Sequence, residues 1–392
     1  MRLNVVYLAS GFPTPDNPSH GIFNLRAANA LKEHVNLTVI QYRIFKPGRK
    51  LVEKIKEDGF NRIILCVPYS PVGEEKLYYF NNRIIYRFTR LFAFGILRNA
   101  DLVHASDGNL GVVASWLKKR FSFKLLVQFI GGDLNQDLTK IYRKSWMKDW
   151  LKKLDAVTFN SKSLQSYFNQ LFGSHPVSQV IYRGVNTDIF HPSNTKAEDE
   201  IVFYFLGGLP AYSTFTHGRN TKGGMNLMAA WKKLEEENPA SKMKLLFAGP
   251  DADLQLVRDW RQGLGVPGKV EIYGKIAPSE IASFHRKGDV ALLPSLEEGL
   301  PNVALEAMAT GNLVIGNRVG GIPEVILDNA NGLLCATPDA EGLFQKMTQV
   351  LEQPGLVSTL GQAARKNVVA GFSHSSFAVN YISLYQNLLK TS

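Results

Sequence analysis

Short apolar runs alternate with amphipathic stretches along the first half of the chain. A short apolar run bounded by polar turns is typical of a strand that is buried on both faces of a sheet. Because strands that alternate with helices form parallel sheets, this half is predicted to be a doubly wound α/β domain. Strands are predicted over residues 3–9, 35–40, 63–67, 102–104, 124–129, 156–159 and 177–181, and helices over residues 23–32, 110–119 and 163–171.

A second alternation follows a polar segment at residues 193–200. Its apolar runs predict strands over residues 201–206, 244–248, 270–273, 290–294 and 313–315. The last stretch, residues 372–389, has the amphipathic periodicity of a helix. A chain of this length is long enough to form two domains of ordinary size. We expect an N-terminal domain at residues 1–192, a C-terminal domain at residues 193–371, and a terminal helix within residues 372–392.

The charge of the chain is unevenly distributed. Its 392 residues have a net charge of +11. Residues 1–195 contain 27 Lys and Arg against 14 Asp and Glu, a net charge of +13, whereas the remaining residues have a net charge of −2. The basic half should attract an acidic partner such as membrane phospholipid, a lipid-linked phosphate, an anionic glycan or nucleic acid.

Cysteine content and hydropathy restrict the class of protein. Cys66 and Cys335 lie far apart in apolar runs, so neither a disulfide framework nor a metal site is expected. No apolar run approaches the roughly eighteen residues that would cross a bilayer, and the first apolar run lacks a convincing signal-peptide cleavage site. We therefore expect a cytoplasmic protein.

The most informative pattern lies at residues 298–325. Pro301 suits the first turn of a helix, Gly311 suits its C-terminal end, and the residues between them favour helix. The N-terminus of such a helix presents free N–H groups and the positive end of its dipole. The pattern predicts a site for an anion, most naturally a phosphate, with Glu298 and Glu306 holding different parts of an elongated ligand.

The order of elements around this segment is also informative. A buried strand, a loop with Glu298, a helix, a second strand and the turn Gly-Gly-Ile-Pro-Glu follow one another. This order resembles the donor-binding core of the family 4 retaining glycosyltransferases, and the resemblance covers nearly the whole chain. It implies the GT-B fold, in which two Rossmann-like domains face each other and the last helix crosses back onto the first. By this resemblance, residues 1–192 bind the acceptor and residues 193–371 bind a nucleotide-sugar donor.

The resemblance also implies which residues bind the donor. Glu298 is implied to bind sugar hydroxyls, Glu306 the ribose and Lys222 the diphosphate, although a surface lysine without a ligand is the alternative for Lys222. Gly208 stands where the family usually has an arginine, and Arg219 in the following insert is a candidate replacement. The remaining residues of the implied donor site are Gly21, which could also be a plain turn glycine, Gly207, Gly274, Lys275, Ile276, Gly299, Leu300, Pro301 and Asn302.

Three residues of the N-terminal half are implied to lie on the acceptor side: His104, Gly132 and Asp133. Asp133 follows a predicted strand and could orient a sugar hydroxyl or assist the acceptor. An N-cap or Asx-turn role for Asp133 and a core position for His104 remain equally compatible with the sequence. Many family members have a histidine just before this loop, where this chain has Ile130, so that contact is missing.

The implied reaction is glycosyl transfer with retention at the anomeric carbon by an enzyme of the hexosyltransferase class. Its implied catalytic residues are Glu298, Lys222 and Asp133. No second carboxylate is obviously placed as a covalent nucleophile. The resemblance implies a reaction on one face of the sugar, in which the departing phosphate helps to take the proton of the acceptor. The sequence has no cluster of His and Cys, so no metal is expected. No cofactor is expected either, and the nucleotide-diphosphate sugar is the donor substrate.

Two basic amphipathic stretches could meet a membrane. Residues 142–153 place Trp146 and Trp150 among basic residues, and residues 82–98 mix arginines with large apolar residues. Such helices can lie in the headgroup layer, although apolar stripes at helical spacing are also typical of a core. The predicted partners are a nucleotide-sugar donor, a glycan or lipid-linked sugar acceptor and an anionic membrane surface, and not nucleic acid, since no nucleic-acid motif is present.

The function expected from these patterns is the synthesis of a surface polysaccharide or glycolipid at the inner face of the membrane. Two other functions fit the same architecture. A nucleotide-sugar 2-epimerase would isomerise its substrate without an acceptor, and a binding protein would keep the fold without catalysis, as Ile130 and Gly208 allow. A dehydrogenase is disfavoured because no Gly-x-Gly-x-x-Gly follows an early strand.

Overall fold

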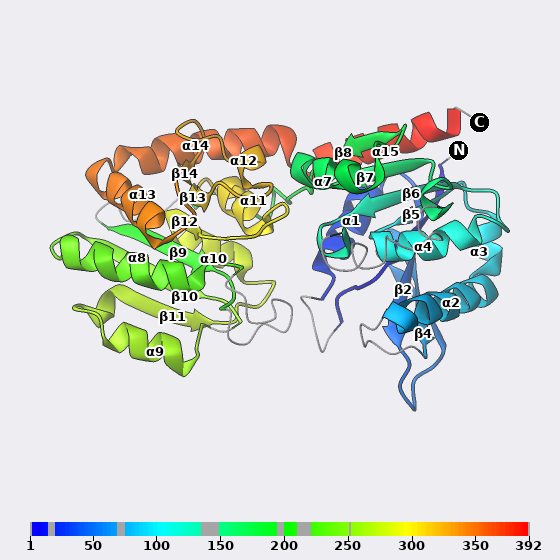
Figure 1. The fold of residues 1–392 in the computed structure, drawn as a ribbon, viewed down its shortest axis with the longest axis horizontal. Helices are drawn as coiled ribbons and strands as arrows, with labels where there is room; N and C mark the ends of the chain where they lie inside the picture. Colours follow the sequence, from blue (N-terminus) through cyan, green and yellow to red (C-terminus); the bar gives the residue numbers. More distant parts are fainter. Residues whose placement is uncertain are drawn as a thin grey trace. The chain divides into compact units, whose positions relative to one another are not determined.

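A computed structural model describes residues 2–14, 20–68, 75–134, 149–193, 200–209, 221–250 and 252–390. The chain divides into two compact units, Met1–Tyr182 with His374–Ser392, and Arg183–Ser373 (Figure 1). Each unit is built around one predominantly parallel sheet with helices packed on it. The predicted pair of Rossmann-like α/β domains is therefore confirmed.

Within its described residues, the first unit has one eight-stranded sheet in the order β3-β4-β2-β1-β5-β6-β7-β8. Neighbouring strands are parallel except β3 and β4, which are antiparallel. The strands are β1 Asn4–Ala9, β2 Asn36–Ile44, β3 Val52–Glu57, β4 Phe60–Val67, β5 Leu102–Ala105, β6 Lys124–Phe129, β7 Ala156–Phe159 and β8 Ser178–Val180.

Helices cover both faces of this sheet. Alternate residues of β1 point to opposite faces. Val6 belongs to the core that the sheet forms with helices α2, α3, α4 and α7, whereas Val5 and Tyr7 belong to the core formed with α1 and the C-terminal helix α15. The sheet is therefore a buried middle layer with a core on each side. The helices are α1 Ile22–Leu31, α2 Glu75–Phe92, α3 Phe94–Arg98, α4 Gly108–Leu117, α7 Lys162–Phe172 and α15 His374–Lys390.

The described residues of the second unit form a six-stranded, wholly parallel sheet in the order β11-β10-β9-β12-β13-β14. Its main core lies between the sheet and helices α8 and α13, with Trp231 and Met347 completely buried. Strand bounds are β9 Ile201–Leu206, β10 Met243–Ala248, β11 Val270–Gly274, β12 Val290–Leu293, β13 Leu313–Asn317 and β14 Leu333–Cys335. Helix bounds are α8 Gly224–Glu237, α9 Gln255–Gln262, α10 Ile281–Lys287, α11 Asn302–Ala309, α12 Ile322–Val325, α13 Ala340–Glu352 and α14 Gly355–Gly371, and Pro267–Lys269 is a 3-10 turn.

Two strands were not predicted from the sequence. Strand β3 is rich in charged residues because it is an edge strand, half exposed to solvent, so it lacks a continuous apolar run. Strand β14 is buried but only three residues long, which is too short for a recognisable pattern.

Within the part of the chain that the structure describes, no helix is long and apolar enough to cross a membrane.

Candidate functional site

A cavity of about 210 Å³ lies at the carboxyl ends of β9 and β12 in the second unit. Ligands of doubly wound sheets bind outside this edge, where loops leave the strands. The cavity brings together six residues that the sequence predicts for the donor: Gly207, Lys222, Glu298, Leu300, Pro301 and Asn302. Segments nearly one hundred residues apart in the sequence therefore share one polar cleft.

Lys222 and Glu298 form an ion pair in the wall of this cavity. The Nζ atom of Lys222 donates a hydrogen bond to Oε2 of Glu298 at 2.5 Å. The lysine side chain is 42% exposed and the glutamate side chain 15% exposed, so a ligand can reach the cation. The pair offers one group for anionic oxygens and one acceptor for hydroxyl groups.

Tight backbone packing holds both residues in place. Gly223, which follows Lys222, is the N-cap residue of α8 and has the left-handed conformation (φ 70°). A Cβ atom there would lie 1.8 Å from the carbonyl oxygen of Pro294. Gly320 has φ 53°, and a Cβ atom there would lie 1.7 Å from the carbonyl oxygen of Glu298. Only glycine fits either position, so both loops are packed backbone against backbone.

Helix α11 points its N-terminus toward the same cavity. Pro301 is the N-cap residue rather than part of the first turn, and the helix begins at Asn302 without a capping side chain. Asn302 and Val303 line the cavity, and the first N–H groups of a helix have no partner within it. The helix ends at Ala309, Thr310 is its C-cap residue, and Gly311 follows with φ 80°. This arrangement can bind an anion beside Glu298.

Glu306 lies outside the cavity that contains Lys222 and Glu298. Its side chain is only 5% exposed, and Oε2 lies 3.4 Å from Nε2 of the completely buried His285. Glu306 is not among the residues that line the cavity at Glu298, because it lies one turn further along α11 and its carboxylate contacts α10. The sequence placed both glutamates in one ligand site but gave no sign of the contact with His285.

The remaining predicted donor residues are also dispersed. Gly274 and Lys275 line a separate cavity of about 630 Å³, together with Arg258 and Arg261 of α9. Ile276 follows them and is half-buried. The structure therefore does not join this predicted base-reading segment to the cavity at Glu298 in one enclosed space.

The predicted arginine replacement cannot be placed. Arg219 lies within residues 210–220, outside the described part of the chain, and Gly208 follows Gly207 without lining the cavity. Arg183, which the sequence reasoning missed, does line the cavity near Lys222 and Glu298. A single arginine beyond a short edge strand gives no pattern by which it could have been found. It adds a second cationic side chain to the cavity wall.

In the first unit, Gly21 and His104 occupy structural positions. Gly21 is the N-cap of α1 (φ 65°), where a Cβ atom would lie 2.2 Å from the carbonyl carbon of Gly11. His104 is completely buried, and its Nδ1 atom lies 2.8 Å from the hydroxyl of Tyr385 on α15. Burial lowers the pKa of His104 to about 3. These positions match the turn-glycine and core-histidine alternatives.

Asp133 lies at the carboxyl edge of the first sheet, after β6 and beside the N-terminus of α4. It is 4% exposed and accepts hydrogen bonds from the backbone N–H groups of Gly108, Ile130, Gly131 and Leu134. The pKa of Asp133 is raised to about 6, mainly by burial and secondly by the negative charge of Asp107. The backbone hydrogen bonds act in the opposite direction and lower the pKa. The carboxylate of Asp133 therefore organises its own loop, as the Asx-turn alternative requires. The neighbouring Gly132 has open space around it, since a Cβ atom built there would meet no atom within 4 Å.

We expect the free energy of unfolding to carry a pH dependence that arises from Asp133. Since its folded pKa lies above the ordinary value, the folded state binds the proton more tightly, and stability falls as pH rises from about 4 to about 6. The full contribution is about 3 kcal/mol, at about 1.4 kcal/mol per pKa unit. Urea unfolding of the wild type and of Asp133→Asn between pH 4.5 and 7.5 measures it. A stability difference between the two proteins that does not change with pH would contradict this expectation.

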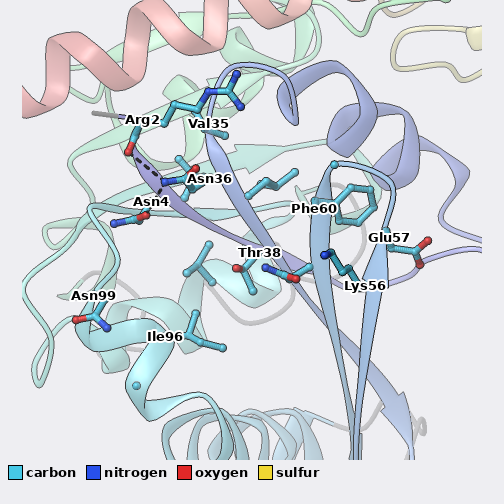
Figure 2. Close-up of a pocket in the computed structure, with 16 residues that line it drawn as sticks. Arg2, Asn4, Val35, Asn36, Thr38, Lys56, Glu57, Phe60, Ile96 and Asn99 are labelled. Carbon is cyan, nitrogen blue, oxygen red and sulfur yellow. Dashed lines mark hydrogen bonds between the residues drawn. The ribbon is translucent and has the colours of Figure 1, made fainter.

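A larger cavity, of about 930 Å³, lies at the opposite, amino edge of the first sheet (Figure 2). Figure 2 shows Asn36 hydrogen-bonded to the carbonyl oxygen of Arg2 and to Oδ1 of Asn4 beside it. Since doubly wound sheets bind ligands at their carboxyl edge, size alone does not make this cavity the functional site.

Within the described residues, no group of three or more His, Cys, Asp or Glu side chains could hold a metal ion.

Comparisons with known proteins relate both halves of the chain to glycosyltransferases. The sequence profile described as Glycosyl transferases group 1 matches residues 187–367, and the profile described as Glycosyltransferase Family 4 matches residues 20–189. Two curated proteins are similar over 74% of this chain and 76% of their own length: an uncharacterized glycosyltransferase of Methanocaldococcus jannaschii, 34% identical, and the N-acetyl-alpha-D-glucosaminyl L-malate synthase of Bacillus anthracis, 25% identical. The solved structure of sucrose-phosphate synthase from Thermosynechococcus elongatus shares the fold, with a TM-score of 0.76 at 21% identity over the whole of both chains.

Proposed function

Because this chain belongs to the group 1, family 4 glycosyltransferases, we propose that it transfers a sugar from a nucleotide-diphosphate donor to a glycan or lipid-linked acceptor with retention at the anomeric carbon. The observation that carries the proposal is the Lys222–Glu298 pair beside the N-terminus of α11. In this proposal Lys222 and the helix N-terminus bind the diphosphate, and Glu298 accepts hydrogen bonds from the sugar hydroxyls.

Charge on the leaving diphosphate is the main electrostatic demand of the reaction. As the glycosidic bond breaks, negative charge increases on the phosphate oxygens, and fixed positive groups stabilise it. Lys222, Arg183 and the N–H groups of α11 can supply that stabilisation without a metal ion. In the proposed mechanism the departing phosphate assists removal of the acceptor proton, and Asp133 orients the acceptor.

The acceptor side is proposed to act at an anionic membrane surface in the synthesis of a polysaccharide or glycolipid. The supporting observation is the exposed face of α2, which carries Phe80, 60% exposed, and Leu91, 71% exposed, together with Arg83, Arg87 and Arg90. Residues 76–100 contain no Asp or Glu. A helix face with exposed apolar and cationic side chains suits the headgroup layer of an anionic bilayer. Of the other basic stretch, residues 142–153, the structure describes only residues 149–153, and Trp150 there is buried in the core rather than exposed.

This surface predicts salt-sensitive binding to anionic vesicles. Arg87→Glu combined with Arg90→Glu should abolish co-sedimentation with phosphatidylglycerol vesicles at low salt, because each arginine near the surface contributes about 1 kcal/mol. Lys242→Glu combined with Lys366→Glu makes the same change of charge at exposed positions in the second unit and should leave binding intact. Equal loss in both variants would indicate that net charge alone is responsible, and absence of wild-type binding would remove the membrane proposal.

The transferase proposal is tested by release of a nucleoside diphosphate from UDP-, GDP- and ADP-sugars. A transferase releases it in proportion to an added acceptor. A 2-epimerase would convert the nucleotide-sugar to an isomer without any acceptor, and an inactive binding protein would do neither. Acceptor-dependent release therefore separates all three functions.

A further inference from the structure

A buried chain of polar side chains lies behind α11 in the second unit. It contains Asn312, Tyr204 of β9, His285 of α10 and Glu306 of α11. The first three are completely buried, and Glu306 is 4% exposed. Nδ2 of Asn312 lies 3.0 Å from the Tyr204 hydroxyl, the Tyr204 hydroxyl lies 2.7 Å from Nδ1 of His285, and Nε2 of His285 lies 3.4 Å from Oε2 of Glu306.

The direction of each hydrogen bond follows from the chemistry of its ends. Asn312 also donates from Nδ2 to the carbonyl oxygen of His285 at 2.7 Å, and a carbonyl only accepts, so the NH₂ group of Asn312 faces both partners. The oxygen of Tyr204 therefore accepts from Asn312, and its own proton is directed to Nδ1 of His285. A neutral His285 that accepts at Nδ1 carries its proton at Nε2. That N–H group points at the carboxylate of Glu306.

We propose that Tyr204 and His285 are positioning residues that orient the carboxylate of Glu306 toward the ribose of the donor. This inference rests on the proposed function, together with the prediction from the sequence that Glu306 binds the ribose of the same donor, outside the cavity at Glu298. A nearly buried carboxylate is costly unless hydrogen bonds stabilise it, and in surroundings of low dielectric each bond also restricts its direction. The Tyr204 hydroxyl acts through the tautomer of His285. Without that hydroxyl, the proton can move to Nδ1, and the lone pair on Nε2 would then face Glu306.

The test is the affinity of the full chain for UDP, GDP and ADP, measured by calorimetry. Tyr204→Phe should weaken binding of the preferred nucleotide about tenfold, the effect of one lost hydrogen bond. Tyr385→Phe is the matched control, because it removes a buried hydroxyl 2.8 Å from Nδ1 of His104 in the other unit. The control should leave nucleotide affinity unchanged.

A double-mutant cycle separates positioning from general stability. In the Glu306→Gln background, Tyr204→Phe should no longer change nucleotide affinity, because it acts only through that carboxylate. An equal loss in both backgrounds, or the same loss from Tyr385→Phe, would overturn the inference. If Tyr204→Phe fails to fold, His285→Phe removes the Nε2–H group and enters the same cycle.

Failure of the inference and failure of the proposed function give different results. If Glu306→Gln leaves affinity unchanged while Lys222→Ala weakens it, Glu306 does not bind the ribose and the inference is wrong, but the donor site at Lys222 stands. If no nucleoside diphosphate binds the wild type and no nucleotide-sugar is consumed, the proposed function is itself wrong and the inference with it.

Discussion

Replacement of Lys222 by alanine is expected to lower kcat/KM for the nucleotide-sugar donor by at least about tenfold, a conservative bound because removing one transition-state hydrogen-bond donor typically costs about 100-fold or more. The Nζ atom is 2.5 Å from Glu298 in the cavity wall, and the side chain is 42% exposed. Partly exposed ion pairs contribute only about 0–1 kcal/mol to folding, so the free energy of unfolding should change little. The loss of activity would then reflect the missing charge at the diphosphate.

The chain contains a closely matched control for this substitution. Lys233, on α8 of the same unit, is also 42% exposed and forms an ion pair with Glu341 at 2.7 Å. Lys233→Ala removes the same charge away from the cavity, together with the ion pair to Glu341 and a longer contact with Glu237 at 3.8 Å. Steady-state kinetics and urea unfolding of both variants give the comparison. Equal kcat/KM values for Lys222→Ala and Lys233→Ala would place the donor elsewhere.

Replacement of Gly320 by alanine should have the larger effect, because it should damage both activity and stability. Its φ of 53° disfavours a Cβ atom, and that atom would lie 1.7 Å from the carbonyl oxygen of Glu298. The neighbouring Gly321 donates to the carbonyl oxygen of Gly299 at 2.8 Å, so the turn and the donor loop are held together. We expect a loss of at least about 3 kcal/mol in stability and displacement of Glu298 from the cavity.

Gly48→Ala isolates the conformational part of that effect. Gly48 has φ 85°, but no atom lies within 4 Å of a Cβ atom built there. Its replacement should cost only about 1 kcal/mol, the usual penalty for an ordinary residue in the left-handed region. Thermal unfolding and donor kinetics should separate the two variants clearly. A Gly320→Ala protein as stable and as active as Gly48→Ala would show that this packing does not maintain the site.

The strands that are buried on both faces could be predicted from the sequence because such strands read as continuous apolar runs. The edge strand β3 could not, since solvent on one side permits its charged residues. The order of strands in each sheet also depends on how connections cross over, which apolar periodicity alone does not report. The fold class could therefore be predicted from the sequence, whereas the charged edge strand β3 and the order of the strands could not.

The candidate site, like the fold, could be predicted only in part from the sequence. The motif around Glu298 and the lysine beside Gly223 were visible in the sequence, and the structure brings Lys222 and Glu298 into contact. The placement of Glu306 against His285 was not visible, because it depends on how α10 packs against α11. Arg183 was also missed, since a lone arginine becomes notable only when the fold places it in the cavity wall. The roles of all these residues remain predictions.

The most direct test of the central claim follows a nucleotide-sugar through the reaction. Proton NMR of the product formed from the preferred UDP-, GDP- or ADP-sugar, with and without an acceptor, reports both transfer and anomeric configuration. The proposed function predicts acceptor-dependent release of the nucleoside diphosphate, a product with the anomeric configuration of the donor, and at least about tenfold slower release by Lys222→Ala. An inverted product, an isomeric nucleotide-sugar formed without acceptor, or an unchanged rate in Lys222→Ala would contradict it.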